Sequence, residues 1–172
     1  MSEEKKDYGQ TLNLPSTDFP MRANLPEREP TIQKDIFENG LYEKILKKNE
    51  EHETFILHDG PPYANGEIHA GHALNKILKD TIVRYKSMKG YYAPYVPGYD
   101  THGMPTEKKA IEKLGLDRSK IPVTKFRDTC RGFTEKYKDI QTEGFKRLGV
   151  LGDWENPYIT YDPKMEARQI GV

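Results

Sequence analysis

The chain has 172 residues, a formal net charge of zero at pH 7 and a single cysteine, Cys130. This length is typical of one domain, the balanced charge excludes a globally basic surface for nucleic acid, and one cysteine excludes an internal disulfide. Hydrophobic residues make up only 35% of the chain, no apolar run approaches a membrane span and the N-terminus lacks a signal peptide's apolar segment, so we expect a cytoplasmic protein without a membrane partner.

Residues 1–28 are polar and interrupted by prolines, and we expect them to form an extended N-terminal arm. Its apolar side chains could anchor the arm on a neighbouring surface, while a disordered tail is an equal alternative for its first residues. The predicted domain covers residues 29–172. It opens with one amphipathic helix over 31–48, where apolar residues recur at helical spacing in spite of Gly40.

A short apolar run over 54–57 predicts a strand that is buried on both sides of a parallel sheet. A helix over 73–88 and a second strand over 91–96 follow, and together they form half of a doubly wound α/β unit. The right-handed crossover places the loops near Gly60 and Asp100 at the same carboxyl edge of the sheet. The apolar positions of the helix share one face: Leu74, Ile77, Leu78, Ile82, Tyr85 and Met88.

Two more helices are predicted over 105–114, ended by Gly115 and Asp117, and over 124–148, with Thr124 as the N-cap of the second. The apolar residues of the longer helix are interpreted as core: Phe126, Cys130, Phe133, Tyr137, Ile140, Phe145 and Leu148. We expect Trp154 to pack on that helix, and Asp162 to open a last short helix. That helix has only begun where the sequence stops, so we expect the chain to be truncated.

The candidate site lies in 58–80, HDGPPYANGEIHAGHALNKILKD, where a Gly/Pro-rich loop leads into the long helix. First-turn N–H groups of a helix lack intrahelical partners and carry partial positive charge, which suits phosphate. His69 and His72 are three residues apart and share a helix face, and Gly71 has no Cβ to keep a ligand off the backbone. The pattern predicts two imidazole donors that hold a polyphosphate and stabilise negative charge developing on it.

The residues alone leave alternatives open. His-x-Gly-His is a weak signal by itself, and its i, i+3 spacing without a nearby cysteine does not favour a metal site, for which zinc proteases use HExxH. Asp100 either pairs with a substrate ammonium at the edge of the sheet or caps the following helix. His102 is equally compatible with loop structure and with substrate contact.

Three segments resemble the class I aminoacyl-tRNA synthetases in their isoleucyl form. GPPYANG with HxGH and ALNKILKD, in 60–80, is similar to the family's first signature. PYVPGYDTHGMP, in 94–105, resembles the family's PYVPGWDTHGLP, although Tyr99 and Thr106 depart from the usual tryptophan and aliphatic residue. RLGV, GDW and PY, in 147–158, resemble its RLGVxGDW…PY segment, so the similarity covers nearly the whole chain.

The resemblance implies the first half of a Rossmann-type catalytic domain over 29–172, truncated before the editing insertion. The implied reaction is activation of isoleucine by ATP with Mg²⁺, followed by transfer to tRNA(Ile), in a monomeric enzyme. The family's KMSKS loop and zinc-binding tail have no counterpart in these residues. A valyl-type synthetase, disfavoured by the loop Tyr63–Gly66, and a catalytically inactive binding module are the alternatives.

The resemblance also assigns roles to matching positions. The expected catalytic residues are His69, Gly71 and His72. The expected ATP-binding residues are these three together with Gly60, Pro61, Pro62 and Tyr63. The expected amino-acid-binding residues are Pro61, beside the side chain, and Asp100, which holds the α-ammonium group.

Overall fold

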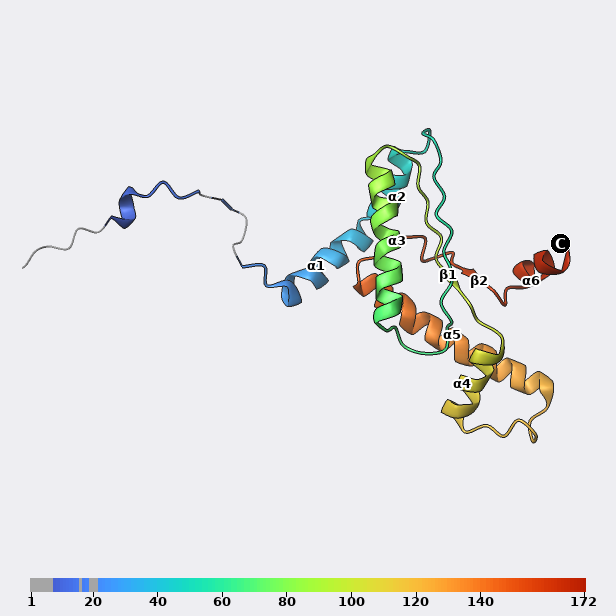
Figure 1. Ribbon diagram of the computed structural model, residues 1–172. Coiled ribbons are helices and arrows are strands. Elements are labelled where there is room, and N and C mark those ends of the chain that lie inside the picture. Colours follow the sequence, from blue (N-terminus) through green and yellow to red (C-terminus); the bar gives the residue numbers. More distant parts are fainter. Residues whose placement is uncertain (1–7, 16, 19–21) are drawn as a thin grey trace, which may run out of the picture.

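The structure is a computed structural model that describes residues 8–15, 17–18 and 22–172. Figure 1 shows the chain as a ribbon coloured along the sequence. Its elements are η1 Gly9–Thr11, α1 Leu25–Glu38, α2 Leu41–Lys48, α3 Ala70–Met88, β1 Gly98–Tyr99, α4 Met104–Leu114, α5 Val123–Arg147, β2 Tyr158–Ile159 and α6 Pro163–Ile170. The predicted arm and tail fall partly on residues 1–7, 16 and 19–21, which lie outside the described residues.

The N-terminal part of the chain differs from the prediction in two respects. First, α1 begins at Leu25, inside the predicted arm, and the described residues before it run away from the rest of the molecule (Figure 1). Second, the predicted single helix over 31–48 is wrong, because Gly40 has a φ of +57° and separates α1 from α2. Glycine adopts this left-handed conformation without steric cost, so the chain turns at this position.

Three extended stretches, 53–64, 92–100 and 153–160, run parallel to one another. The middle stretch pairs with the first through bridges at Thr54–Tyr92 and Tyr63–Asp100, and with the third through β1 and β2. In chain order, α3 lies between the first stretch and the second, and α4 and α5 lie between the second and the third. The predicted parallel α/β class is therefore confirmed, with a small sheet.

The predicted strands are less regular than expected. The stretches 54–57 and 91–96 meet in one bridge, and regular pairing begins beyond Pro97, at β1. Pro94 and Pro97 lack the N–H that a strand ladder needs. The N–H of Tyr95, which lies between them, donates to the Tyr42 hydroxyl at 2.9 Å and not to a neighbouring strand. Burial on both sides was also a wrong prediction, since Ile56 is 64% exposed while its neighbours on the opposite side pack on the core.

Helix α3 starts at Ala70, three residues before the predicted start. The six apolar residues predicted to share one face, from Leu74 to Met88, are 43–80% exposed. The buried positions of α3 are Lys76 and Val83. The described residues therefore leave the apolar face open to solvent, and α3 packs on the core through another face.

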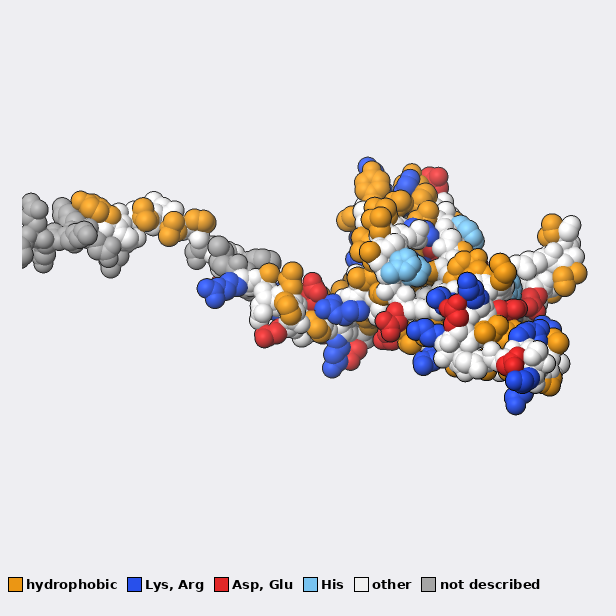
Figure 2. All heavy atoms as spheres, turned by 60° about the horizontal axis from the view of Figure 1, so that its bottom comes forward, with side chains coloured by type: hydrophobic (Ala, Val, Ile, Leu, Met, Phe, Trp, Pro, Cys, Tyr) orange, Lys and Arg blue, Asp and Glu red, His pale blue; other side chains and the backbone are white. Residues whose placement is uncertain are grey.

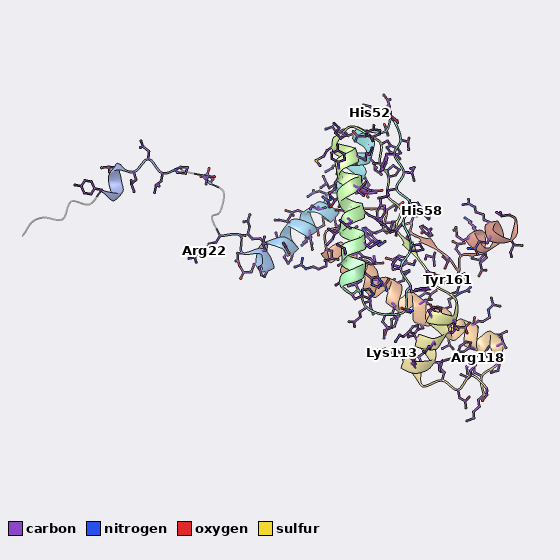
Figure 3. The ribbon with its side chains drawn as sticks, viewed as in Figure 1. Arg22, His52, His58, Lys113, Arg118 and Tyr161 are labelled. Atoms are coloured by element: carbon purple, nitrogen blue, oxygen red, sulfur yellow. The ribbon has the colours of Figure 1, made fainter. Side chains whose placement is uncertain are left out.

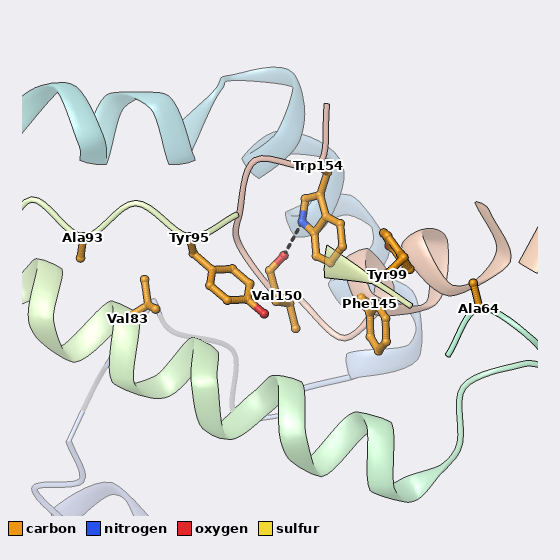
Figure 4. Packing of buried hydrophobic residues seen from close by; sticks show 8 residues of the cluster. All are labelled: Ala64, Val83, Ala93, Tyr95, Tyr99, Phe145, Val150 and Trp154. Atoms are coloured by element: carbon orange, nitrogen blue, oxygen red, sulfur yellow. Dashed lines mark hydrogen bonds between the residues drawn. The ribbon is translucent and has the colours of Figure 1, made fainter. Parts of the chain in front are cut away.

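The core forms between α3, the middle stretch and the C-terminal part of α5 (Figure 4). Trp154 packs on α5 as predicted: its ring stacks on Phe145 with centroids 6.1 Å apart, and its Nε1 donates to the Val150 carbonyl at 3.0 Å. Not every predicted core position of α5 is buried, since Ile140 and Leu148 are each 38% exposed. The buried cluster contains Ala64, Val83, Ala93, Tyr95, Tyr99, Phe145, Val150 and Trp154.

The ends of the C-terminal helices follow local signals. Gly115, at φ +62°, ends α4, and the Asp162 carboxylate caps α6 by accepting from the Lys164 N–H at 2.8 Å, as predicted. The predicted cap at Thr124 is wrong, because α5 already begins at Val123. Figure 3 shows Lys113 and Arg118 near the turn between α4 and α5, at the opposite end of the molecule from His52. None of the described helices is long and apolar enough to cross a bilayer.

Candidate active site

The two histidines of the signature meet at the start of α3. His69 is the N-cap, in an extended conformation, and its Nδ1 accepts a hydrogen bond from the Gly71 N–H at 3.1 Å. The rings of His69 and His72 stack with centroids 3.8 Å apart and planes 19° from parallel. The structure therefore brings the two imidazoles together at a helix N-terminus, as the spacing predicted, although His69 lies just outside the helix.

The surroundings of the two rings indicate where their protons lie. Because Nδ1 of His69 accepts a hydrogen bond, its proton is on Nε2. Nδ1 of His72 is buried and has no hydrogen-bond partner among the described residues, which leaves Nε2 as the nitrogen that can donate to a ligand. Burial, together with the nearby His69 and the Lys76 ammonium, lowers the pKa of His72, which favours the neutral ring. His69 is then an Nε2–H donor, and Nε2 is the nitrogen of His72 left for contact with a ligand.

A cavity of about 280 Å³ adjoins the pair. It lies between the signature loop, residues 59–66, and the start of α3, and the Phe145 ring of α5 meets His72 edge-on at 6.5 Å. We call this the histidine cavity; its described lining is Gly60, Pro62, His69, Gly71, His72, Asn75, Lys76 and Phe145. None of these is acidic, and the first turn of α3, all of whose residues are described, holds no acidic side chain. The cavity therefore suits an anion.

The structure gives a second explanation for glycine at position 71, in addition to the predicted access of a ligand to the backbone. A Cβ at this position would lie 3.0 Å from Cε1 and 3.1 Å from Nδ1 of His69. The missing side chain therefore leaves room for the imidazole that caps the helix. One of the first-turn N–H groups that the sequence offered to a phosphate is used by this cap.

A group of three buried or partly buried charges lies directly behind the cavity. Asp59 is the first residue of the signature loop, and its carboxylate forms ion pairs with Lys76, which is buried, and with Lys79 at 2.7 Å. Burial alone would raise the pKa of Asp59, but the two ammonium groups and the Gly98 N–H, at 2.8 Å, lower it. For Lys76, burial lowers the pKa and Asp59 opposes that effect. We call Asp59, Lys76 and Lys79 the charge cluster.

Sequence reasoning missed the charge cluster. Lysines in a helix are mostly solvated, so the sequence alone assigns no role to Lys76 or Lys79. The available signal was their i, i+3 spacing on the face that also carries Val83, together with an aspartate directly after an apolar run.

The signature loop is held from its other side by α5. Gln141, which is fully buried, donates from Nε2 to the Tyr63 carbonyl at 2.9 Å and to the Gly66 carbonyl at 2.8 Å. Near the same turn, a Cβ on Gly144 would lie 2.8 Å from Ile68 Cδ1, so glycine allows close packing of α5 beneath the loop. Loop, α3 and α5 therefore fix one another at this site.

The remaining predicted residues do not line the histidine cavity. Pro61, Tyr63 and Asp100 are not among its lining residues, but Tyr63 pairs with Asp100 in a parallel bridge, so the two predicted loops do meet. The Asp100 carboxylate is partly buried and accepts from the Thr160 hydroxyl at 3.5 Å. Gly103 is the N-cap of α4, which excludes that alternative for Asp100. His102 lines a different cavity, of about 260 Å³, beside α4 and α5.

The described residues contain no group of three or more histidine, cysteine, aspartate or glutamate side chains that could hold a metal ion. Mg²⁺ prefers oxygen ligands, and the histidine cavity offers imidazoles and an ammonium instead. This donor set does not fit a resident Mg²⁺.

Comparisons with known proteins agree with this geometry. The family described as tRNA synthetases class I (I, L, M and V) matches residues 31–172. Isoleucine–tRNA ligases of Carboxydothermus hydrogenoformans and Caldicellulosiruptor saccharolyticus are 63% and 60% identical over 166 residues, which is 96% of this chain. The chain spans 18% of the length of these relatives.

A solved structure shares the fold. A LeuRS of Agrobacterium radiobacter K84, agnB2, in a ternary complex with tRNA and LeuAMS, matches 88% of this chain and 19% of its own chain, with a TM-score of 0.65 and 21% identity. This likeness supports a partial Rossmann-type catalytic fold. Taken with the family match over residues 31–172, it shows that the chain belongs to the class I tRNA synthetases of the isoleucine, leucine, methionine and valine group.

Proposed function

We propose that this chain is the part of an isoleucine–tRNA ligase that holds the phosphates of ATP while isoleucine is activated. The observation that carries the proposal is the stacked pair of His69 and His72 at the N-terminus of α3, beside a cavity with no acidic lining residue. Identities of 60–63% to isoleucine–tRNA ligases support isoleucine as the amino acid.

The reaction proposed for the complete enzyme has two steps. The carboxylate of isoleucine attacks the α-phosphorus of ATP, which forms isoleucyl-adenylate and releases pyrophosphate. The terminal ribose hydroxyl of tRNA(Ile) then attacks the carbonyl carbon of the adenylate, which forms the isoleucyl ester and releases AMP. Phosphoryl chemistry of this kind depends mainly on positioning and on stabilisation of charge.

The chain's own residues contribute donors to the first step. Nε2–H groups of His69 and His72 donate to phosphate oxygens, and these bonds strengthen as negative charge builds on the pentavalent phosphorus. The lack of a side chain at Gly71 lets the nucleotide approach the backbone. In this proposal the loop residues Gly60 to Tyr63 frame the adenine and the amino acid.

Asp100 is proposed to bind the α-ammonium group of isoleucine. Its carboxylate is partly buried, and its backbone is paired with Tyr63 of the signature loop, which supports a position at the edge of the ATP site. Pro61, in the same loop, is proposed to contact the isoleucine side chain. Mg²⁺ is proposed to arrive with the phosphates of ATP, since the residues of the histidine cavity do not suit it.

The proposed domain limits follow the sequence analysis. Residues 29–172 form the first half of the catalytic domain, and 1–28 are an N-terminal extension. The second half of the ATP site, the editing domain and most tRNA contacts are proposed to lie in regions of the relatives that this chain does not span. We also propose that the complete enzyme is a monomer and lies in the cytoplasm.

The test is isoleucine-dependent exchange of pyrophosphate into ATP, measured on the longer protein that contains this chain. We expect exchange with isoleucine to exceed exchange with valine, and His72→Ala to abolish it. His52→Ala is the control, because His52 is an exposed histidine that follows α2 in the sequence and lies far from the N-terminus of α3 (Figure 3). Equal exchange with valine, or no exchange by a folded wild-type protein, would contradict the proposal.

A further inference from the structure

We propose that Lys76, held by Asp59 in the wall of the histidine cavity, is a positioning residue whose ammonium group acts on the His72 ring and gives the cavity a positive charge. The inference deepens the proposed function and rests on it for its role in catalysis. The placement of Lys76 is independent of that function. It follows from the contacts of one buried ammonium group.

The contacts of Asp59 connect the signature loop to α3, β1 and β2. Its carboxylate binds Lys76 and Lys79 of α3 and accepts from the Gly98 N–H of β1 at 2.8 Å. Its backbone carbonyl accepts from the hydroxyl of Tyr158 in β2. Since Asp59 is the first residue of the signature loop, these bonds fix the loop relative to the start of α3. An aspartate is almost never fully buried unless it is paired, and the Asp59 side chain is 0% exposed.

Lys76 extends this link to His72. It follows His72 by one helical turn, lines the histidine cavity, and donates to the Tyr95 hydroxyl at 3.2 Å. Its ammonium lies 5.1 Å from the centroid of the Phe145 ring, which in turn meets His72 edge-on. A change at Lys76 therefore acts on His72 both through packing and through charge.

The charge of the cluster does not cancel. Two ammonium groups face one carboxylate, so one positive charge remains beside a cavity whose described lining has no acidic residue. Interactions between charges are screened little at such a depth. The net charge favours an anionic ligand and disfavours a second cation, including a protonated His72.

The groups that face His72 can be named element by element. From the start of α3 these are His69 and Lys76, and α5 contributes Phe145, which does not titrate. The signature loop contributes Gly60 and Pro62 to the shared cavity, and neither is charged. Of the groups that face His72, Lys76 is thus the one that carries an ammonium, and the Asp59 carboxylate opposes the effect of burial on its pKa.

Lys79 provides a matched comparison within the cluster. Both lysines bind Asp59, but the Lys76 side chain is 2% exposed and lines the cavity, whereas the Lys79 side chain is 15% exposed and is not a lining residue. If the cluster only holds Asp59 in place, Lys76→Met and Lys79→Met should have similar effects. If Lys76 acts on the cavity, the two variants should differ.

The experiment is a titration of the His72 ring by NMR, in the 172-residue chain without ligand. Lys76→Met is expected to raise the pKa of His72, and Lys76→Arg to keep it near the wild-type value. Lys79→Met and the exposed Lys47→Met should leave it unchanged. A pKa of His72 that is unchanged in Lys76→Met, or that rises equally in Lys79→Met, would overturn the proposal. Unfolding of both Lys76 variants while Lys79→Met folds would also overturn it, since Lys76 would then be structural.

A second measurement uses inorganic tripolyphosphate as the probe. Lys76→Met should weaken its binding by at least about tenfold, because tenfold is the effect of one unit charge at a distance of about 12 Å and an effective dielectric of about 20, and Lys76 lines the cavity. Lys79→Met should weaken it less. If the wild-type chain does not bind tripolyphosphate but the pKa of His72 still responds only to Lys76, the proposed function fails and the positioning role stands. Binding that is equal in both variants would contradict the role in the cavity.

Discussion

Lys76 and Asp59 form an ion pair whose side chains are 2% and 0% exposed, at the junction of the signature loop and α3. A buried pair adds little over apolar packing, but the loss of one member leaves the other as an uncompensated charge. The pair therefore makes the fold around the histidine cavity sensitive to single substitutions.

Asp59→Asn should lower the free energy of unfolding by about 3–5 kcal/mol, because both lysines lose their carboxylate while Lys76 stays buried. Urea denaturation measures the effect. The control is Glu38→Gln, since the pair of Glu38 with Lys34 is 64% and 69% exposed and should contribute less than about 1 kcal/mol. Equal losses in the free energy of unfolding for the two substitutions would contradict the prediction, because burial of the Asp59 pair would then have no energetic effect.

Acidification should destabilise the chain as the pH falls below about 6.5, the ordinary pKa of histidine. Because the folded pKa of His72 is lowered, the unfolded ring binds a proton at a pH where the folded ring does not, so stability falls with falling pH until the folded ring also titrates. The lowered pKa of Asp59 acts at stronger acid: its contribution is present above 3.8 and is lost as the pH falls through the folded pKa.

The measurement is the urea midpoint between pH 8 and pH 5, for wild type and His72→Gln. We expect the variant to lose part of the pH dependence near 6. A wild-type midpoint that rises on acidification over this range would contradict the lowered pKa of His72.

Gly98→Ala should destabilise the protein by at least about 1–3 kcal/mol, the usual cost of overpacking. A Cβ at this position would overlap the Tyr158 ring, which crosses over Gly98 to donate its hydroxyl to the Asp59 carbonyl. Gly132→Ala is the matched control, because no atom lies within 4 Å of its added Cβ and it stands inside α5. The control should be neutral or up to about 1 kcal/mol more stable, and thermal unfolding of both variants would reveal any reversal of this order.

Gln141→Leu should free the signature loop from α5, because the two carbonyls of Tyr63 and Gly66 lose their donor. The expected loss of stability is about 1–3 kcal/mol, with faster amide hydrogen exchange at Ala64, whose N–H donates to the Asp100 carbonyl at 2.8 Å. Gln141→Glu, which adds a buried charge, should be worse. Unchanged exchange at Ala64 in Gln141→Leu would show that the loop does not depend on α5.

The sequence predicted the parts of the fold that depend on local signals. Helix α4 ends at its glycine, and α6 begins at its aspartate cap, because these residues act within one turn. The break at Gly40 was missed because apolar spacing continues through it. The environment of each face of α3 depends on tertiary packing, which periodicity does not contain.

The site was predicted in the same uneven way. His69, Gly71 and His72 are neighbours in the sequence, so their meeting follows from the start of the helix. Gly60 and Pro62 belong to the loop that leads into this helix, and they line the same cavity. Asp59 and Lys76 are 17 residues apart, and their pairing could not be separated from ordinary surface charge. Phe145 reaches His72 from another helix altogether.

The most direct test of the account is a crystal structure of the longer protein with ATP bound. Histidine side chains appear at the molecular surface in Figure 2, and of the two site histidines His69 is exposed and His72 is partly buried. The account predicts phosphate oxygens within about 2.7–3.2 Å of Nε2 of both His69 and His72, the range of ordinary hydrogen bonds. Phosphates bound away from the N-terminus of α3, with neither imidazole in contact, would contradict it.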